Sequence, residues 1–197
     1  MAYGEVKIKL AKKKIVVGVT GLPGSGKSTF TRIAREMGFP VVVMGDFVRM
    51  EAEKRGLEPT AENLGRLMVE IRREKGEDAI AKLTVEAVRG IDNPIVFIDG
   101  VRSLKEIEEF KKSFRDFRLI AVHAPEKVRF ERLTRRLRSD DVTTIEKFRE
   151  RDLRELKIGV GETIALADRI IENVGSKKEF KVKVKKFLEE ISREVLS

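Results

Sequence analysis

One stretch of ten residues, GLPGSGKSTF at positions 21–30, limits what this chain can fold into more than any other feature. Residues 21–28 match the pattern G-x-x-x-x-G-K-S/T at every fixed position. A continuous apolar run, KIVVGVT at 14–20, precedes the pattern, and a helical periodicity follows it at 27–37. A strand that is apolar on both faces is typical of a parallel sheet covered by helices. The glycines between strand and helix predict a tight turn at the edge of that sheet.

Four further apolar segments alternate with helical patterns along the chain. They predict strands at 40–44, 94–99, 118–124 and 168–173, and we expect the strand at 40–44 to be buried like the first. Helices are predicted at 46–55, 60–75, 78–89 and 103–113, after residue 125, up to about 159–161, and from 176 onward. Ser103-x-x-Glu106 and Ser176-x-x-Glu179 are capping boxes that open two of these helices. The alternation predicts an α/β fold of three layers around a five-stranded parallel sheet.

The 197 residues are expected to form a single domain, 1–197. Within it, 125–160 is predicted to be a lid region. Apolar residues alternate with lysines at 5–10, so 1–13 are expected to form either an extra edge strand or a mobile arm.

The composition limits which binding partners and which cellular compartment are expected. No run of eighteen apolar residues exists, so no membrane span is predicted. Cysteine is absent, which excludes disulfides and thiolate zinc sites and is typical of a cytoplasmic protein. The net charge of +9 favours anionic partners, but basic and acidic residues are mixed along the helices, so a solvated surface is favoured over a nucleic-acid face. The 38% content of charged residues and the absence of Gln resemble proteins from very hot habitats. No feature predicts an oligomeric state.

The 21–28 stretch is predicted to be a P-loop, which binds nucleotide phosphates. Glycines allow backbone N–H groups to point inward and form an anion nest, and the following helix N-terminus adds partial positive charge. Lys27 is predicted to act catalytically at the β- and γ-phosphates, and the Ser28 hydroxyl to ligate Mg²⁺. The predicted contacts of ATP in this stretch are Gly21, Leu22, Pro23, Gly24, Ser25, Gly26, Lys27, Ser28 and Thr29.

Asp99 closes the apolar segment PIVFID and is predicted to hold Mg²⁺ through water. A GTPase would need an N-K-x-D or T-K-x-D element for guanine, and neither occurs. A motor ATPase usually needs more chain than is present here. These observations favour a small-molecule kinase, with an RNA-associated P-loop ATPase as the alternative.

The acceptor is expected to bind at the ends of the second and third strands, beside the P-loop. Asp46 follows the second strand and is predicted to orient or deprotonate an acceptor hydroxyl, or to help hold Mg²⁺. Arg49, one helical turn on, suits a bidentate grip on phosphate. Arg102 follows the Asp99-Gly100 pair and offers another anion clamp. Asp46, Arg49 and Arg102 are therefore the predicted contacts of a small phosphorylated acceptor.

The densest cluster of basic residues lies at 125–143 and contains Arg129, Arg132, Arg135, Arg136 and Arg138. Phosphoryl transfer depends on positioning and on neutralising charge, so mobile arginines that close over the γ-phosphate fit this chemistry. We expect Arg132, Arg136 and Arg138 to serve the site, with Arg136 and Arg138 catalytic, and some of the others to be structural. His123, the only histidine, is expected to be a packed or strand-end residue.

The motifs together resemble P-loop kinases of the nucleoside-monophosphate kinase group, and within it the dephospho-CoA kinase family. TGLPGSGKSTFTRIAREMGFPVV followed by Asp46, the RSDDVT stretch and ADRIIEN at 167–173 carry this resemblance. It implies that Asp46 is a base toward a ribose 3′-hydroxyl, that Arg138 lies near the phosphates and that Asn173 lies near the adenine edge. Gly45-Asp46-x-x-Arg49 instead resembles adenylate kinase, in which that arginine grips the acceptor's monophosphate.

The DGVRS, RLRSDD and ELKIGVGE stretches are most similar to an uncharacterised archaeal family of predicted nucleotide kinases. The resemblance, and the rule that the P-loop strand neighbours the strand ending in the magnesium-binding acid, imply the strand order 2-3-1-4-5. The function expected from it is ATP-dependent phosphoryl transfer to a small phosphorylated nucleoside-type acceptor, as in dephospho-CoA kinase. A kinase of AMP, CMP or UMP and the RNA-associated ATPase remain the alternatives.

Overall fold

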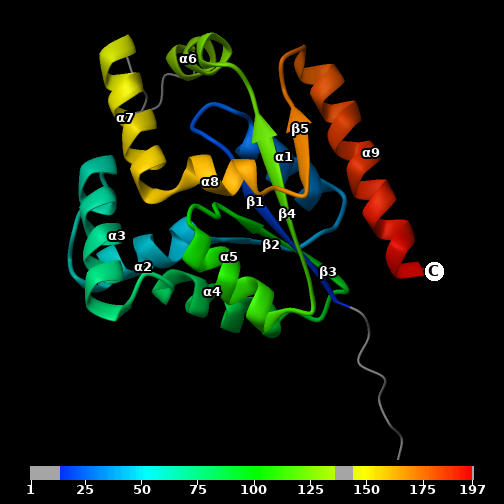
Figure 1. The fold of residues 1–197 in the computed structure, drawn as a ribbon, viewed down its shortest axis with the longest axis horizontal. Coiled ribbons are helices and arrows are strands. Elements are labelled where there is room, and N and C mark those ends of the chain that lie inside the picture. Colours follow the sequence, from blue (N-terminus) through cyan, green and yellow to red (C-terminus); the bar gives the residue numbers. More distant parts are fainter. Residues whose placement is uncertain (1–13, 136–143, 197) are drawn as a thin grey trace, which may run out of the picture.

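A five-stranded sheet runs through the middle of the molecule and carries helices on both faces (Figure 1). The computed structural model describes residues 14–135 and 144–196. Every strand pair is parallel, and the order β2-β3-β1-β4-β5 confirms the predicted one. The strands are β1 (Ile15–Thr20), β2 (Val41–Val43), β3 (Ile95–Asp99), β4 (Asp116–His123) and β5 (Arg169–Glu172). The predicted arm or strand at 1–13 lies outside the described residues.

Alternate residues of the central strands enter two separate cores. Val16 of β1 packs with α2, α4 and α5 on one face of the sheet. Its neighbours Ile15 and Val17 pack on the other face against α1 and α9. This two-sided burial is the physical reason that β1 and β3 are apolar up to their last residues, Thr20 and Asp99. The helices are α1 (Lys27–Glu36), α2 (Met44–Lys54), α3 (Ala61–Lys75), α4 (Ala79–Arg89), α5 (Leu104–Ser113), α6 (Glu126–Thr134), α7 (Ile145–Ile158), α8 (Val160–Ala165) and α9 (Lys177–Leu196).

Two features differ from the sequence-based expectation. The prediction of a buried second strand is wrong, because β2 has three residues, all half-buried, and among the described strands it pairs with β3 alone. The helix predicted to end near 159–161 does end at Ile158, where Gly159 takes the left-handed conformation at φ +118°. The chain then forms a further short helix, α8, which lies against β1 and β4 and was not predicted.

The two helix N-termini that were predicted from capping boxes are confirmed. The Ser103 side chain accepts from the N–H of Glu106, and the Glu106 carboxylate accepts from the N–H of Ser103. The same exchange joins Ser176 and Glu179 ahead of α9. No helix within 14–135 or 144–196 is long and apolar enough to cross a membrane.

The carboxyl ends of three neighbouring strands bring the distant motifs together. Asp99, the last residue of β3, is in register with Val19 of β1 and with Val43 of β2. The N–H of Gly100 then bonds to the carbonyl of Val19 at 3.0 Å, which fixes the turn after Asp99 against the start of the P-loop. The prediction that the P-loop strand and the Asp99 strand are neighbours is therefore confirmed.

Candidate functional site

The P-loop follows β1 and turns tightly against Arg129 of α6 and against Asn173, which directly follows β5. Gly24 and Gly26 have φ angles of +79° and +114°, in the left-handed region that favours glycine. A Cβ at Gly26 would lie 2.2 Å from the Asn173 side-chain nitrogen, and one at Gly24 would lie 2.7 Å from the Arg129 carbonyl oxygen. These two positions therefore require glycine on grounds of both conformation and space.

Two side chains from distant segments hold the loop from behind. The buried Asn173 amide donates to the Ser25 carbonyl at 2.8 Å and accepts from Arg132 Nη2 at 3.1 Å. Arg129 donates to the Pro23 carbonyl at 3.1 Å. The structure thus places Asn173 on the P-loop backbone and Arg132 on Asn173, while their contact with a nucleotide stays a prediction.

A polar cavity of about 250 Å³ lies in front of the loop. It brings together nine of the predicted site residues. Five carry side-chain chemistry: Lys27 and Ser28 from the P-loop, Asp99 from β3, Arg49 from α2 and Arg102 from the turn after β3. The other four are the P-loop residues Leu22, Pro23, Gly24 and Gly26. The remaining lining residues are Val43, Gly45, Gly100, Leu133, Arg151 and Glu155.

A second, more apolar hollow of about 410 Å³ lies along α2. Arg49 lines both hollows, whereas Asp46 lines only this second one. Its other walls are Met50, Glu53, Leu57 and Pro59. The predicted acceptor residues therefore divide between two adjoining spaces.

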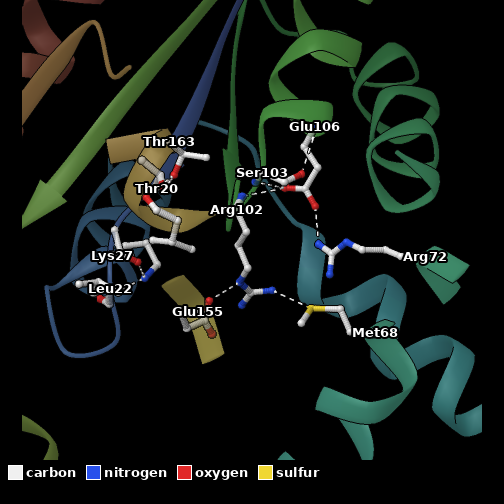
Figure 2. Close-up of polar contacts among 12 residues, drawn as sticks. Thr20, Leu22, Lys27, Met68, Arg72, Arg102, Ser103, Glu106, Glu155 and Thr163 are labelled. Carbon is white, nitrogen blue, oxygen red and sulfur yellow. Dashed lines mark hydrogen bonds and ion pairs between the residues drawn. The ribbon is translucent and has the colours of Figure 1, made fainter. Parts of the chain in front are cut away.

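Lys27 turns its ammonium group back onto the P-loop. Its Nζ donates to the carbonyl oxygens of Gly21 and, at 3.3 Å, of Leu22 (Figure 2). Burial lowers the pKa of Lys27 to about 8, against the opposing attraction of Asp99 and Glu155. Burial likewise raises the pKa of the Asp99 carboxyl, and the Lys27 ammonium acts in the opposite direction. Each group thus stabilises the charged form of the other in a site that desolvates both.

The two arginines predicted to grip the acceptor each contact a carboxylate. Arg49 forms an ion pair with Asp46, one helical turn away on α2. The Arg102 Nε lies 3.0 Å from a Glu155 carboxylate oxygen, and its Nη1 contacts the Met68 sulfur at 3.5 Å (Figure 2). Both arginines are therefore neutralised by partners from the chain itself.

Glu106 fixes the backbone from which Arg102 projects. Its side chain is fully buried and accepts from the N–H groups of Arg102 and Ser103 at 2.7 and 3.2 Å. It also forms an ion pair with Arg72 of α3 at 2.6 Å (Figure 2). Because three donors satisfy this buried carboxylate, the turn between β3 and α5 is held at a defined distance from α3.

Arg129 is structural, as expected for part of the arginine cluster. It is buried, forms a bidentate pair with Asp152 of α7 at 2.8 and 2.6 Å, and stacks 5.0 Å from the centre of the Phe148 ring. His123 is an exposed residue at the end of β4, which confirms its expected position. Arg136 and Arg138 lie outside the described residues, so their catalytic role stays a prediction.

Sequence reasoning missed the two charged cavity residues of α7, Arg151 and Glu155. The signal available was their i, i+4 spacing, which places both on one face of a helix. That spacing alone does not tell which face meets the P-loop.

Comparison with known proteins places this site in a family. Residues 20–149 match the family model described as an AAA domain. The UPF0200 protein of Hyperthermus butylicus is 48% identical over 179 residues, which cover 91% of this chain and 96% of that protein. The chain belongs to the UPF0200 family. The UPF0200/UPF0201 protein of Archaeoglobus fulgidus is also 48% identical, over 183 residues and 91% of this chain, but the chain spans only 57% of that longer relative.

Solved structures show that this UPF0200 chain has a P-loop kinase-like fold. The TT1252 protein of Thermus thermophilus superposes with a TM-score of 0.64 at 22% identity and covers 91% of this chain and 98% of its own. Dephospho-CoA kinase from Campylobacter jejuni gives 0.57 at 19% identity, covering 91% and 98%. Shikimate kinase from Acinetobacter baumannii gives 0.57 at 17% identity, covering 94% and 97%. The resemblance to kinases of this fold is thereby confirmed, and at these identities the likeness concerns the fold alone.

Proposed function

We propose that the chain is an ATP-dependent phosphotransferase that moves the γ-phosphoryl group to a hydroxyl of a small phosphorylated nucleoside-type acceptor. The observation that carries the proposal is the shared cavity. One hollow of about 250 Å³ holds the P-loop lysine and serine, the Asp99 carboxylate and the two arginines Arg49 and Arg102. Donor and acceptor groups therefore have a common space in which in-line transfer can occur.

On the donor side, the P-loop backbone and Lys27 bind the phosphates of ATP. Ser28 and Asp99 are oxygen donors that line the same cavity, and Mg²⁺ prefers such ligands with only one or two protein groups in its shell. In the described part of the chain no three acidic or histidine side chains gather into a metal site, which also fits an ion bound largely through phosphate and water. Mg²⁺, when bound, neutralises charge on the transferring phosphoryl group.

On the acceptor side, the charges favour an alcohol over a phosphate as nucleophile. Arg49 and Arg102 are each paired with a carboxylate, so neither presents an unpaired positive charge to a monophosphate. Asp46 is more than half exposed and can exchange its pair with Arg49 for the hydroxyl hydrogen of an acceptor. As a general base it would contribute roughly 10²–10⁴-fold to the rate.

The experiment is a screen of acceptors with purified protein and Mg²⁺·ATP. Dephospho-CoA represents the hydroxyl class, and AMP, CMP and UMP represent the monophosphates. Each reaction is repeated with Asp46→Asn and with Glu53→Gln, a matched control on the same helix in the same outer hollow. We expect transfer to dephospho-CoA, a loss of about 10²-fold or more in kcat for Asp46→Asn, and near wild-type kcat for the control.

Other outcomes separate the rival functions. Phosphorylation of a monophosphate but not of dephospho-CoA would keep the kinase and reject the alcohol acceptor. ATP hydrolysis that RNA stimulates, with no acceptor phosphorylated, would favour the RNA-associated ATPase. That alternative has less support, because Arg129 of the basic cluster is buried against Asp152 and Arg132 contacts Asn173.

A further inference from the structure

Glu155 lies between the donor and acceptor halves of the cavity. Its carboxylate contacts the Arg102 guanidinium at 3.0 Å and is near enough to Lys27 to oppose the lowering of the lysine pKa that burial causes. Figure 2 shows Glu155 beside both side chains, with Arg102 reaching across from the turn after β3. Glu155 thus faces two of the cations that line the cavity, Lys27 and Arg102.

Glu155 is not needed to hold its own helix in place. One turn earlier, Asp152 forms the bidentate pair with the buried Arg129. Phe148 is fully buried and packs with Leu133 between α7 and α6. The Arg102 backbone is fixed separately, by Glu106. The ion pair with Glu155 therefore neutralises the charge of the Arg102 side chain, while the contacts of Glu106 fix the position of the Arg102 backbone.

A monophosphate and an alcohol meet this pair differently. A phosphate that binds Arg102 must replace Glu155, so one anion is exchanged for another and the freed carboxylate lies beside the new negative charge. A reacting hydroxyl group makes no such demand, and the pair can stay intact beside it even where the acceptor carries a phosphate elsewhere. The neutral pair thus disfavours a monophosphate as acceptor and leaves the binding of an alcohol unaffected.

We propose that Glu155 is a specificity-determining residue that keeps Arg102 neutral, so that the acceptor side of the cavity selects a hydroxyl acceptor over a nucleoside monophosphate. This inference rests on the proposed function, because it concerns the acceptor of that same site. It makes a prediction about binding, however, that holds whether or not transfer is observed.

The test is the binding of CMP and of AMP by calorimetry, with a non-hydrolysable ATP analogue and Mg²⁺ saturating the donor side. In Glu155→Gln the charge is lost with little change in shape, and we expect both monophosphates to bind about three- to tenfold more tightly. Glu150→Gln, an exposed position on the same helix, makes the same change in net charge and should alter binding less than twofold. In an Arg102→Ala background the gain from Glu155→Gln should vanish, because the guanidinium that it releases is absent.

Several results would overturn the inference. These are unchanged or weaker monophosphate binding in a folded Glu155→Gln protein, an equal gain in Glu150→Gln, or a gain that survives Arg102→Ala. If Glu155→Gln does not fold, Glu155→Asp takes its place: the shorter side chain loosens the pair and should give a smaller gain, and no gain would again refute the role. The acceptor screen reports separately on the enzyme. Tighter monophosphate binding in Glu155→Gln without any transfer would reject the proposed function and support the Glu155 role. Transfer to dephospho-CoA without tighter monophosphate binding would support the proposed function and reject the Glu155 role.

Discussion

The pair between Arg129 and Asp152 should stabilise the protein far more than its surface ion pairs. The two side chains are 6% and 13% exposed, and two hydrogen bonds join them. Arg129 also donates to the carbonyls of Ala124 and Pro23. Arg129→Met would remove all of these donors and leave a buried carboxylate without its partner.

The magnitude follows from burial. Loss of one member of a buried ion pair costs about 3–5 kcal/mol, because the remaining charge stays desolvated. For a chain of this length, 1 kcal/mol corresponds to about 2–4 °C in Tm, so Arg129→Met should melt about 6–20 °C below the wild type. Replacing both residues, as Arg129→Met with Asp152→Leu, removes the stranded charge and should recover at least half of that loss.

Thermal unfolding followed by circular dichroism is the assay, with Arg66→Met as the matched control. Arg66 pairs with Glu62, but these side chains are 64% and 81% exposed, so the control should shift Tm by less than about 2 °C. The reasoning is refuted if Arg129→Met melts within 2 °C of the wild type. It is also refuted if the double variant is no more stable than Arg129→Met alone.

Three further predictions concern the P-loop. Lys27→Ala should abolish phosphoryl transfer with Tm near that of the wild type, since the lysine bonds only to loop carbonyls among the described contacts; equal turnover would contradict this. Because the pKa of Lys27 is about 8, its ammonium is charged at pH 7 and mostly neutral at pH 9, so ATP affinity should fall as pH rises through 8. Calorimetry in buffers of different ionisation enthalpy should then show uptake of about one proton at pH 9 that Lys27→Met removes, and identical proton counts at pH 7 and 9 would count against it. Gly26→Ala should abolish ATP binding, because its Cβ meets Asn173, whereas Gly38→Ala, at φ +85° with open space around it, should bind ATP normally.

The sequence predicts the parts of the fold that local pattern determines. The apolar run before Gly21, the capping boxes and Asp99 at a strand end each carry their meaning within a few residues. Together with the family resemblance they lead to the observed sheet order and to the cavity that joins Lys27, Ser28 and Asp99. The partial burial of β2 was not predictable in this way, because an apolar run looks the same at the edge of a sheet as at its centre.

The partners of the charged side chains were the other feature that the sequence did not predict. Helical spacing places Arg129 and Arg132 near one face of α6, but only the packed structure shows that one meets Asp152 and the other Asn173. Because 38% of the residues are charged, many arginines near a site are already paired with carboxylates. The number of arginines near the site therefore overstates how many can bind a ligand. Arg49 and Arg102 illustrate this difference, since each was predicted as an anion clamp and each is paired with a carboxylate.

Helix α7 contacts both halves of the site through two carboxylates one turn apart. Asp152 binds Arg129, which donates to the Pro23 carbonyl of the P-loop, and Glu155 binds Arg102 beside Asp99. A displacement of α7 therefore breaks a contact on the donor side and one on the acceptor side together. Arg129→Met should for that reason lower affinity for ATP as well as stability, although Arg129 itself does not line the cavity. Glu155→Gln, in contrast, should change acceptor preference with Tm near the wild type, because the Asp152 anchor remains. The two variants thus separate the structural role of α7 from its electrostatic role.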